Sequence, residues 1–127
     1  MEIEFIKANT NKIKPKATIH MTGKLGFNIE ASNLMGLNEK MSFLIGKDKI
    51  DENRFYLFQS EDEGSATVAK GGDYYYLNAG NAFDLLGMDY KQYTIMFDVS
   101  KDKYNDKDIY VLKKREPKLR NTIKNGL

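Results

Sequence analysis

The chain has 127 residues, of which 41% are hydrophobic and 30% are charged. This size fits one domain, and the balance excludes wholesale disorder, which requires low hydrophobicity and high net charge. The formal net charge of +2 is too small to indicate a nucleic-acid-binding protein by itself, so an electrostatic argument depends on where the charges lie.

Residue usage favours strands and a cytoplasmic location. Eight Tyr and seven Phe, with only two Pro, favour half-buried strands, on which aromatic rings pack well. The absence of cysteine excludes disulfides, thiolate metal sites and a cysteine nucleophile. With no signal-type apolar run and no stretch of 18 or more apolar residues, we expect a cytoplasmic protein without a membrane partner.

The segment over residues 1–14 has the pattern of an edge strand. Ile3 and Phe5 alternate with Glu2 and Glu4, and alternation with a period of two is typical of a strand with one buried face. We therefore expect this segment to pair onto the body of the protein.

An internal repeat follows, with one copy over residues 16–60 and a second over residues 65–116. The offset between the copies starts at 49 residues and grows to about 54. Each copy opens with a hairpin, since Ala17 to Ile19 correspond to Ala66 to Val68 and a glycine-containing turn follows in both. Each copy then predicts a short helix and a second hairpin, whose second strand closes the copy.

In each copy, one residue marks the start of the predicted helix and another marks its end. Asn28 and Asn78 end the second strand of each copy, and Asn is a favoured helix N-cap. Gly36 and Gly87 follow the apolar pairs that close each helix, where glycine supplies the left-handed conformation at the C′ position.

We therefore predict a mainly β fold with short helices, an α+β arrangement of two β-β-α-β-β repeats. The domain extends over residues 1–116, and a basic tail follows over residues 117–127. A unit of about 45 residues buries too little surface to fold alone, so the two copies must share a core. The residues expected in it are Leu34, Leu37, Phe43, Ile45, Leu85, Met88, Ile95 and Phe97.

The strongest candidate for function is the stretch KKREPKLRNTIKNGL, which begins at Lys113 and carries six Lys or Arg against one Glu. Lys and Arg supply most of the affinity for phosphates. A merely solubilising C-terminus is an equal alternative, and Leu119, Ile123 and Leu127 at spacings of four also permit an amphipathic helix that docks on a partner. The candidate nucleic-acid-binding residues are Lys24, Lys113, Lys114, Arg115, Lys118, Arg120 and Lys124.

Other motifs do not indicate catalysis or a cofactor. His20 is the only histidine, and no spacing pairs it with a nucleophile or an orienting carboxylate. The acidic run from Asp102 to Asp108 lacks the internal Gly and the ligand spacing of a calcium loop. The run Tyr74 to Tyr76 could stack on bases, but neighbours on a strand point to opposite faces, so at least one belongs to the core.

The first copy resembles the AbrB-like swapped-hairpin family, which also includes many antitoxins. The resemblance lies in Gly23-Lys24-Leu25, in Phe27 to Glu30 where the family has an apolar-Pro-x-Glu phrase, and in Met35-Gly36-Leu37. It implies a barrel in which two halves exchange hairpins and present paired loops to DNA, and here one chain would supply both halves. The chain departs from the family where Arg is usual, with Lys24 after the turn, Ser32 and Asn33 on the helix, and Asp73 in the second copy.

The leading interpretation is a DNA-binding, transcription-regulator-like module, in which the barrel is the scaffold and the basic residues contact phosphates. The alternative is a protein-protein interaction or assembly module, antitoxin-like or structural, with another protein chain as its partner. Neither interpretation includes an enzymatic activity.

Overall fold

The order β-β-α-β-β occurs twice along the chain, as the repeat predicts. The computed structural model describes residues 1–6 and 13–120. The first unit contains β1 (Lys16–Ile19), β2 (Lys24–Phe27), α1 (Ile29–Met35), β3 (Ser42–Lys47) and β4 (Arg54–Gln59). The second contains β5 (Ala66–Gly71), β6 (Tyr74–Asn78), α2 (Gly80–Leu85), β7 (Tyr93–Tyr104) and β8 (Lys107–Lys114), and the short β9 (Lys118–Leu119) follows.

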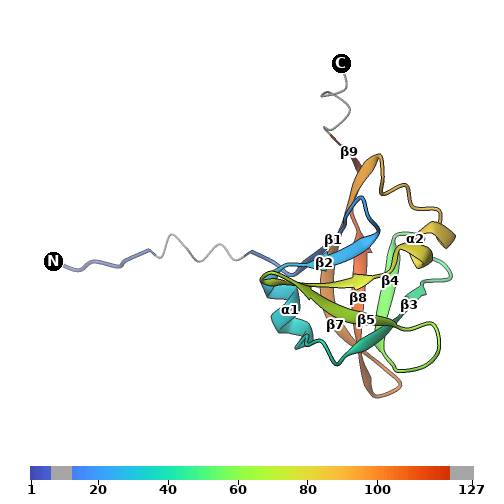
Figure 1. Cartoon of the computed structure of the whole chain (residues 1–127). Helices are drawn as coiled ribbons and strands as arrows, with labels where there is room; N and C mark the ends of the chain where they lie inside the picture. Colours follow the sequence, from blue (N-terminus) through green and yellow to red (C-terminus); the bar gives the residue numbers. More distant parts are fainter. Residues whose placement is uncertain (7–12, 121–127) are drawn as a thin grey trace.

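Eight of the strands close into an antiparallel barrel (Figure 1). Their order is β1-β2-β6-β5-β3-β4-β8-β7, and β7 returns to pair with β1. The first hairpin of each unit therefore pairs with the third strand of the other unit, β1 with β7 and β5 with β3. The mainly β barrel with two short helices agrees with the predicted fold class.

The pairing registers give the barrel a pseudo-twofold relation between its two units. Ala17 lies opposite Phe97 on β1 and β7, and Ala66 lies opposite Phe43 on β5 and β3. Because these are equivalent pairs, the offset is 49 residues on the first strand and 54 on the third, as the repeat indicates. In Figure 1, α1 and α2 lie on opposite sides of the barrel, as this relation requires.

Both helices end as predicted, but only α1 begins with the predicted Asn cap. Gly36 and Gly87 have φ of 61° and 72°, and in both units the next residue donates its backbone N–H to the fifth residue back, as in a Schellman motif. Asn28 caps α1 by accepting from the Ala31 N–H at 2.9 Å. The prediction of a second cap at Asn78 is wrong, because Asn78 pairs with Lys24 in the β2–β6 ladder and α2 begins after Ala79.

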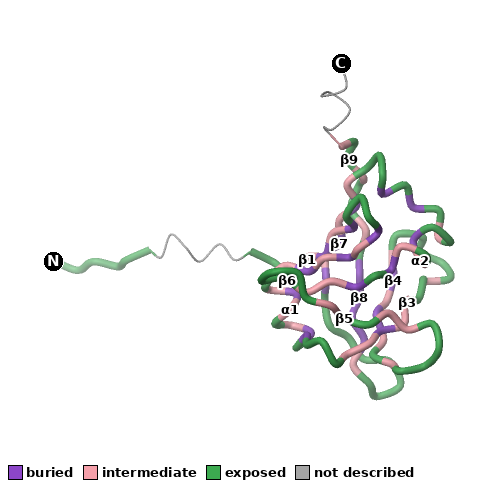
Figure 2. The backbone as a smooth tube through the Cα atoms, viewed as in Figure 1, coloured by how far each residue is buried: buried purple, intermediate pink, exposed green. Residues whose placement is uncertain are grey.

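The shared core lies inside the barrel, where Figure 2 shows the buried positions on the strands. Leu37, Phe43, Met88, Ile95 and Phe97 are buried in one cluster, as predicted, and Leu34 and Ile45 pack against it. The predicted burial of Leu85 is wrong: its side chain is 89% exposed. Phe83 and Leu86 bring α2 onto the core instead, because they lie on the helix face that turns toward the barrel.

The strand predicted over residues 1–14 is not formed in the described part of that segment. Met1–Ile6 and residues 13–15 have no strand pairing, and residues 7–12 lie outside the described residues. Ile3 and Phe5 are 63% and 85% exposed. The alternation of apolar and acidic residues is present in the sequence, but it has no partner strand within the described chain.

Candidate nucleic-acid interface

A row of charged residues crosses four neighbouring strands on the outer face of the barrel. Arg54 on β4 lies opposite Lys113 on β8, Lys113 lies opposite Asp98 on β7, and Asp98 lies opposite Lys16 on β1. The following residue on β4 and the preceding residues on β8 and β7 are buried. Since side chains alternate along a strand, the charged residues point outward on one face.

Arg115 neutralises the single carboxylate within this row. Its Nε donates to Asp98 Oδ2 at 3.0 Å, and its Nη2 donates to Asp98 Oδ1 at 2.7 Å. These hydrogen bonds, followed by the charges of Arg115 and Lys16, lower the pKa of Asp98. Lys14 adds a further positive charge beside Asp98. We call the five cations of this face the basic strip: Lys14, Lys16, Arg54, Lys113 and Arg115.

The end of the predicted basic tail is partly used to hold the chain onto the barrel. Arg120 donates from Nε to the Tyr90 carbonyl at 2.9 Å and from Nη2 to the Ile19 carbonyl at 3.0 Å. Lys118 is exposed on β9, which pairs with the start of β7, and Lys124 lies outside the described residues. Arg120 therefore anchors the chain, whereas Lys118 presents its charge to solvent.

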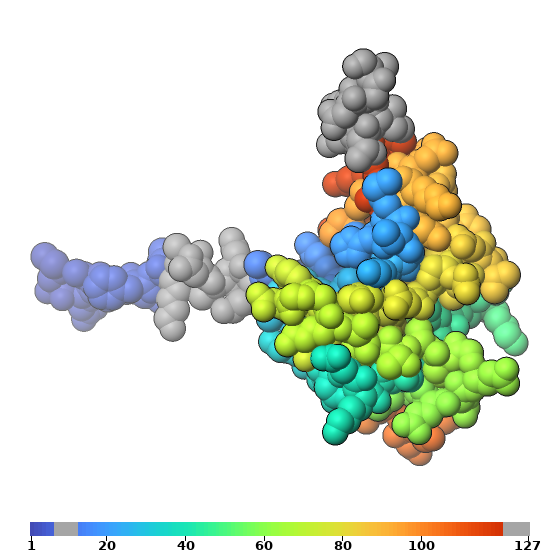
Figure 3. All heavy atoms as spheres, viewed as in Figure 1, coloured from blue at the N-terminus to red at the C-terminus, as the bar shows by residue number. Residues whose placement is uncertain are grey.

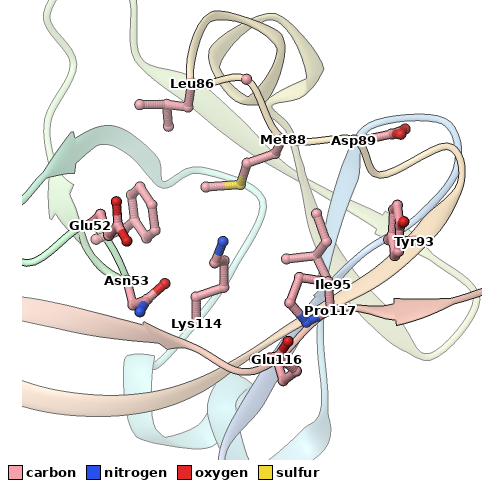
Figure 4. Close-up of a pocket in the computed structure, with 12 residues that line it drawn as sticks. Glu52, Asn53, Leu86, Met88, Asp89, Tyr93, Ile95, Lys114, Glu116 and Pro117 are labelled. Carbon is pink, nitrogen blue, oxygen red and sulfur yellow. The ribbon is translucent and has the colours of Figure 1, made fainter.

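Lys114 lies apart from the basic strip, although it adjoins Lys113 in the sequence. It points into a cleft of about 490 Å³ beside α2, toward Met88 (Figure 4). Glu52, Asp89 and Glu116 also line this cleft. Because alternate residues of a strand point to opposite faces, Lys113 and Lys114 cannot contact the same ligand surface.

Lys24 belongs to a different part of the barrel surface. Its Nζ lies 4.7 Å from the centre of the Tyr76 ring, a cation–π geometry. Of the neighbouring tyrosines, Tyr75 packs against the core and Tyr74 is 58% exposed, so one member of the run belongs to the core, as expected. His20 is exposed on the same outer face, above Gly26.

A second surface feature adjoins the basic strip on the outer face of β3, β4, β8 and the end of β7. It is a mostly apolar cleft of about 760 Å³. Arg54 of the basic strip is one of its lining residues, as are Tyr56 and Asp48, and Asp48 accepts a hydrogen bond from the Tyr56 hydroxyl. We call this the apolar cleft, and its apolar lining includes Leu44, Tyr56, Phe58, Tyr104, Ile109 and Val111.

The hydrogen bond from Tyr56 should set the acid stability of this part of the sheet. The pKa of Asp48 is lowered to about 2. The largest cause is the hydrogen bond from Tyr56, and the backbone N–H groups of Asp51 and Ile50 contribute less. A carboxyl with a lowered folded-state pKa stabilises the protein above its unfolded value of about 4, and this contribution is lost as pH falls toward about 2.

We expect Tyr56→Phe to raise the pKa of Asp48 toward its ordinary value and to reduce the loss of stability between about pH 4 and pH 2. Carboxyl titration by NMR and denaturation at neutral and acid pH would measure the two effects. Tyr104→Phe is the matched control, because the Tyr104 hydroxyl makes no hydrogen bond within the described residues. An Asp48 that titrates identically in both variants would show that the Tyr56 hydroxyl does not hold its charge.

Three members of the basic strip are absent from the residues predicted from the sequence: Lys14, Lys16 and Arg54. They come from two segments far from Lys113 and Arg115 in the chain, and strand register alone brings them together. The only local signal was the spacing of Lys14 and Lys16 around Pro15 at the start of the first predicted strand. Pairing between repeats, which placed the strip, was implied only by the family resemblance.

Comparison with known proteins adds no relative to this description. A scan of protein-family models finds no match, and searches of curated proteins and of solved structures find no significant match.

Within the described residues, neither helix is long and apolar enough to cross a membrane. No group of three acidic or histidine side chains in residues 1–6 and 13–120 has the arrangement of a metal site.

Proposed function

We propose that the chain is a DNA-binding module that contacts phosphates through the basic strip. The observation that carries this proposal is the gathering of five cations from separate segments onto one outer face, with Asp98 the single carboxylate in their row and already paired with Arg115. Phosphate neutralisation by Lys and Arg supplies most non-specific affinity for DNA. A concentrated strip can bind phosphates even though the whole chain carries a net charge of only +2.

The dimensions of the strip fit this role. Neighbouring strands are about 4.8 Å apart, so the four strands from β4 to β1 span roughly 14 Å. One strand of a duplex rises about 3.4 Å per phosphate along the helix axis, so about four phosphates fall within such a length of the axis. Lys16 and Lys113 lie on either side of the neutralised Asp98, which leaves both available for separate phosphates.

The exchange of hairpins between the two units also supports the AbrB-like resemblance. In the arrangement that the resemblance implies, two halves exchange hairpins to build one barrel, and here β1 pairs with β7 and β5 with β3. We propose on this basis a single-chain relative of the transcription-regulator type that acts in the cytoplasm. Its DNA-contacting face would differ from the paired loops of that family, because the expected Arg positions hold Lys24, Ser32 and Asn33.

The proposal predicts binding to duplex DNA that weakens steeply with salt. Each phosphate contact contributes about −0.9 to the slope of log K against log salt, so Lys16→Ala and Lys113→Ala should each reduce the slope by about 0.9. Fluorescence anisotropy of a labelled duplex between about 50 and 200 mM salt measures both affinity and slope.

Two further variants sharpen this experiment. Lys91→Ala removes the same charge from an exposed loop outside the strip and should leave the slope unchanged. Lys118→Ala tests the exposed part of the tail without disturbing the Arg120 anchor. If the full chain does not bind DNA at low salt, or if Lys113→Ala behaves like Lys91→Ala, the basic strip is not a DNA-binding face.

A further inference from the structure

The far half of β7 has an open edge. Ser100–Tyr104 pair with β8 on one side, but on the other side β1 ends at Lys16, opposite Asp98. The last bond on that side runs from the Val99 N–H to the Pro15 carbonyl at 3.0 Å. Within the described residues no strand continues this pairing, so the hairpin of β7 and β8, whose tip projects from the barrel (Figures 1 and 3), carries an unpaired edge.

Asn28 explains why the chain's own residues leave this edge. Its Nδ2 donates to the Lys14 carbonyl at 2.8 Å, and its Oδ1 accepts from the Lys16 N–H at 3.0 Å. Asn28 follows β2, which lies on the opposite side of β1 from β7. These bonds tie the chain to the β2 side of β1, so the pairing along β7 does not continue beyond Pro15 to residues 13 and 14.

The two faces of the open edge differ in chemistry. On one face Lys101 and Lys103 share a single carboxylate, with Nζ atoms 3.4 and 2.7 Å from the oxygens of Asp108. On the other face Tyr104 borders the apolar cleft, which Ile109 and Val111 also line. A strand that fits this edge would carry acidic side chains on one face and apolar side chains on the other, because alternate residues face opposite ways.

The segment Met1–Ile6 of this chain has that pattern. Glu2 and Glu4 alternate with Ile3 and Phe5, and the two apolar side chains are 63% and 85% exposed. Together with the exposed Met1 and Ile6 they form a run of exposed apolar side chains, and a contiguous exposed apolar surface is a signal of an interaction site. We propose that Met1–Ile6 of a second copy adds as a strand to the open edge of β7, with Ile3 and Phe5 toward the apolar cleft and Glu2 and Glu4 toward Lys101 and Lys103.

Strand addition of this kind combines main-chain hydrogen bonds with side-chain selection. Lys101 and Lys103 exceed Asp108 by one positive charge, which favours an acidic strand. Asp102 lies on the cleft face of β7, so the opposite orientation would place Glu2 or Glu4 beside it and is disfavoured. A second copy can return the same contact to the first, and two such contacts close a symmetric dimer. This inference does not depend on DNA binding.

The test is the mass of the full chain in solution, measured by sedimentation over a range of concentrations. We expect a concentration-dependent dimer that Ile3→Ser with Phe5→Ser weakens at least tenfold. The matched control is Ile29→Ser with Leu85→Ser, which changes two exposed apolar side chains on the helices and should leave the dimer intact. A full chain that stays monomeric, or a dimer equally weakened by the control pair, would overturn the proposal.

A charge exchange identifies the partner surface. Lys101→Glu with Lys103→Glu should weaken the dimer, and adding Glu2→Lys with Glu4→Lys to the same chain should restore it. Lys70→Glu with Lys91→Glu, on β5 and an exposed loop, is the control for net charge, and circular dichroism checks that each variant is folded. The chain with all four substitutions should dimerise more tightly than the chain with only Lys101→Glu and Lys103→Glu. If it does not, the acidic segment binds elsewhere.

Discussion

Separation of the chain between Gly64 and Ser65 should leave neither half able to fold as a monomer. Every strand of the first unit has a neighbour from the second: β1 pairs with β7, β2 with β6, β3 with β5 and β4 with β8. A separated half keeps only its own hairpins, and an isolated two-stranded hairpin is marginally stable at best in water. The whole barrel is therefore the folding unit.

The measurement is circular dichroism with sedimentation of residues 1–64 and 65–127, expressed separately and then mixed. Each half alone should lack a cooperative melt as a monomer, and the equimolar mixture should recover one. A half that melts cooperatively as a dimer would agree with the pseudo-twofold relation, because two copies of one unit could form the same set of pairings. A cooperative, monomeric melt of either half would contradict the shared barrel.

The architecture could be predicted because the repeat left local marks on both copies. The glycine turns, the Leu-Met-Gly-Leu and Leu-Leu-Gly-Met helix ends and the alternating strands each follow from backbone chemistry that acts over a few residues. The errors arose where the copies differ. Asn78 was expected to cap α2 by analogy with Asn28, but β6 continues through it, and the second helix begins without a side-chain cap.

The orientation of Leu85 depends on how α2 is rotated against the barrel. Its place beside Gly87 matches that of Leu34 beside Gly36, so both leucines were expected in the core. Which of two adjacent apolar residues faces inward depends on how the helix is rotated against the barrel, and a helix of six residues is too short for its periodicity to decide this. The structure buries Met35 and turns Leu86, not Leu85, toward the core.

The candidate site was harder to predict than the fold, since it depends on register between units. Charge density along the chain indicated the stretch from Lys113 to Lys124, but adjacent residues of a strand separate onto two faces, which removes Lys114 from the strip. Arg120 shows the opposite problem: its charge suggested a ligand contact, whereas its guanidinium binds two backbone carbonyls. Only the three-dimensional pairing of β4, β8, β7 and β1 brings Lys16 and Arg54 to Lys113.

Replacement of Phe43 or Phe97 by Ala should destabilise the protein by about 3–5 kcal/mol each. The two residues are equivalent in the repeat, both are fully buried, and each meets an aromatic ring of the other unit. Phe43 packs edge to face on Tyr110, with the ring centres 6.3 Å apart. Phe97 packs edge to face on Phe55, with the ring centres 5.9 Å apart. Truncation of either leaves a cavity at the junction of the units.

Chemical denaturation with both variants measures this cost, and Leu85→Ala is the matched control. Because Leu85 is 89% exposed, its truncation should change the free energy of unfolding by no more than about 0.5 kcal/mol. The total free energy of unfolding of a domain is about 5–15 kcal/mol, so loss of one aromatic contact between the units should remove a large part of it. A loss below about 1 kcal/mol for both phenylalanines, or a loss at Leu85 as large as theirs, would mean that the two units do not join through this core.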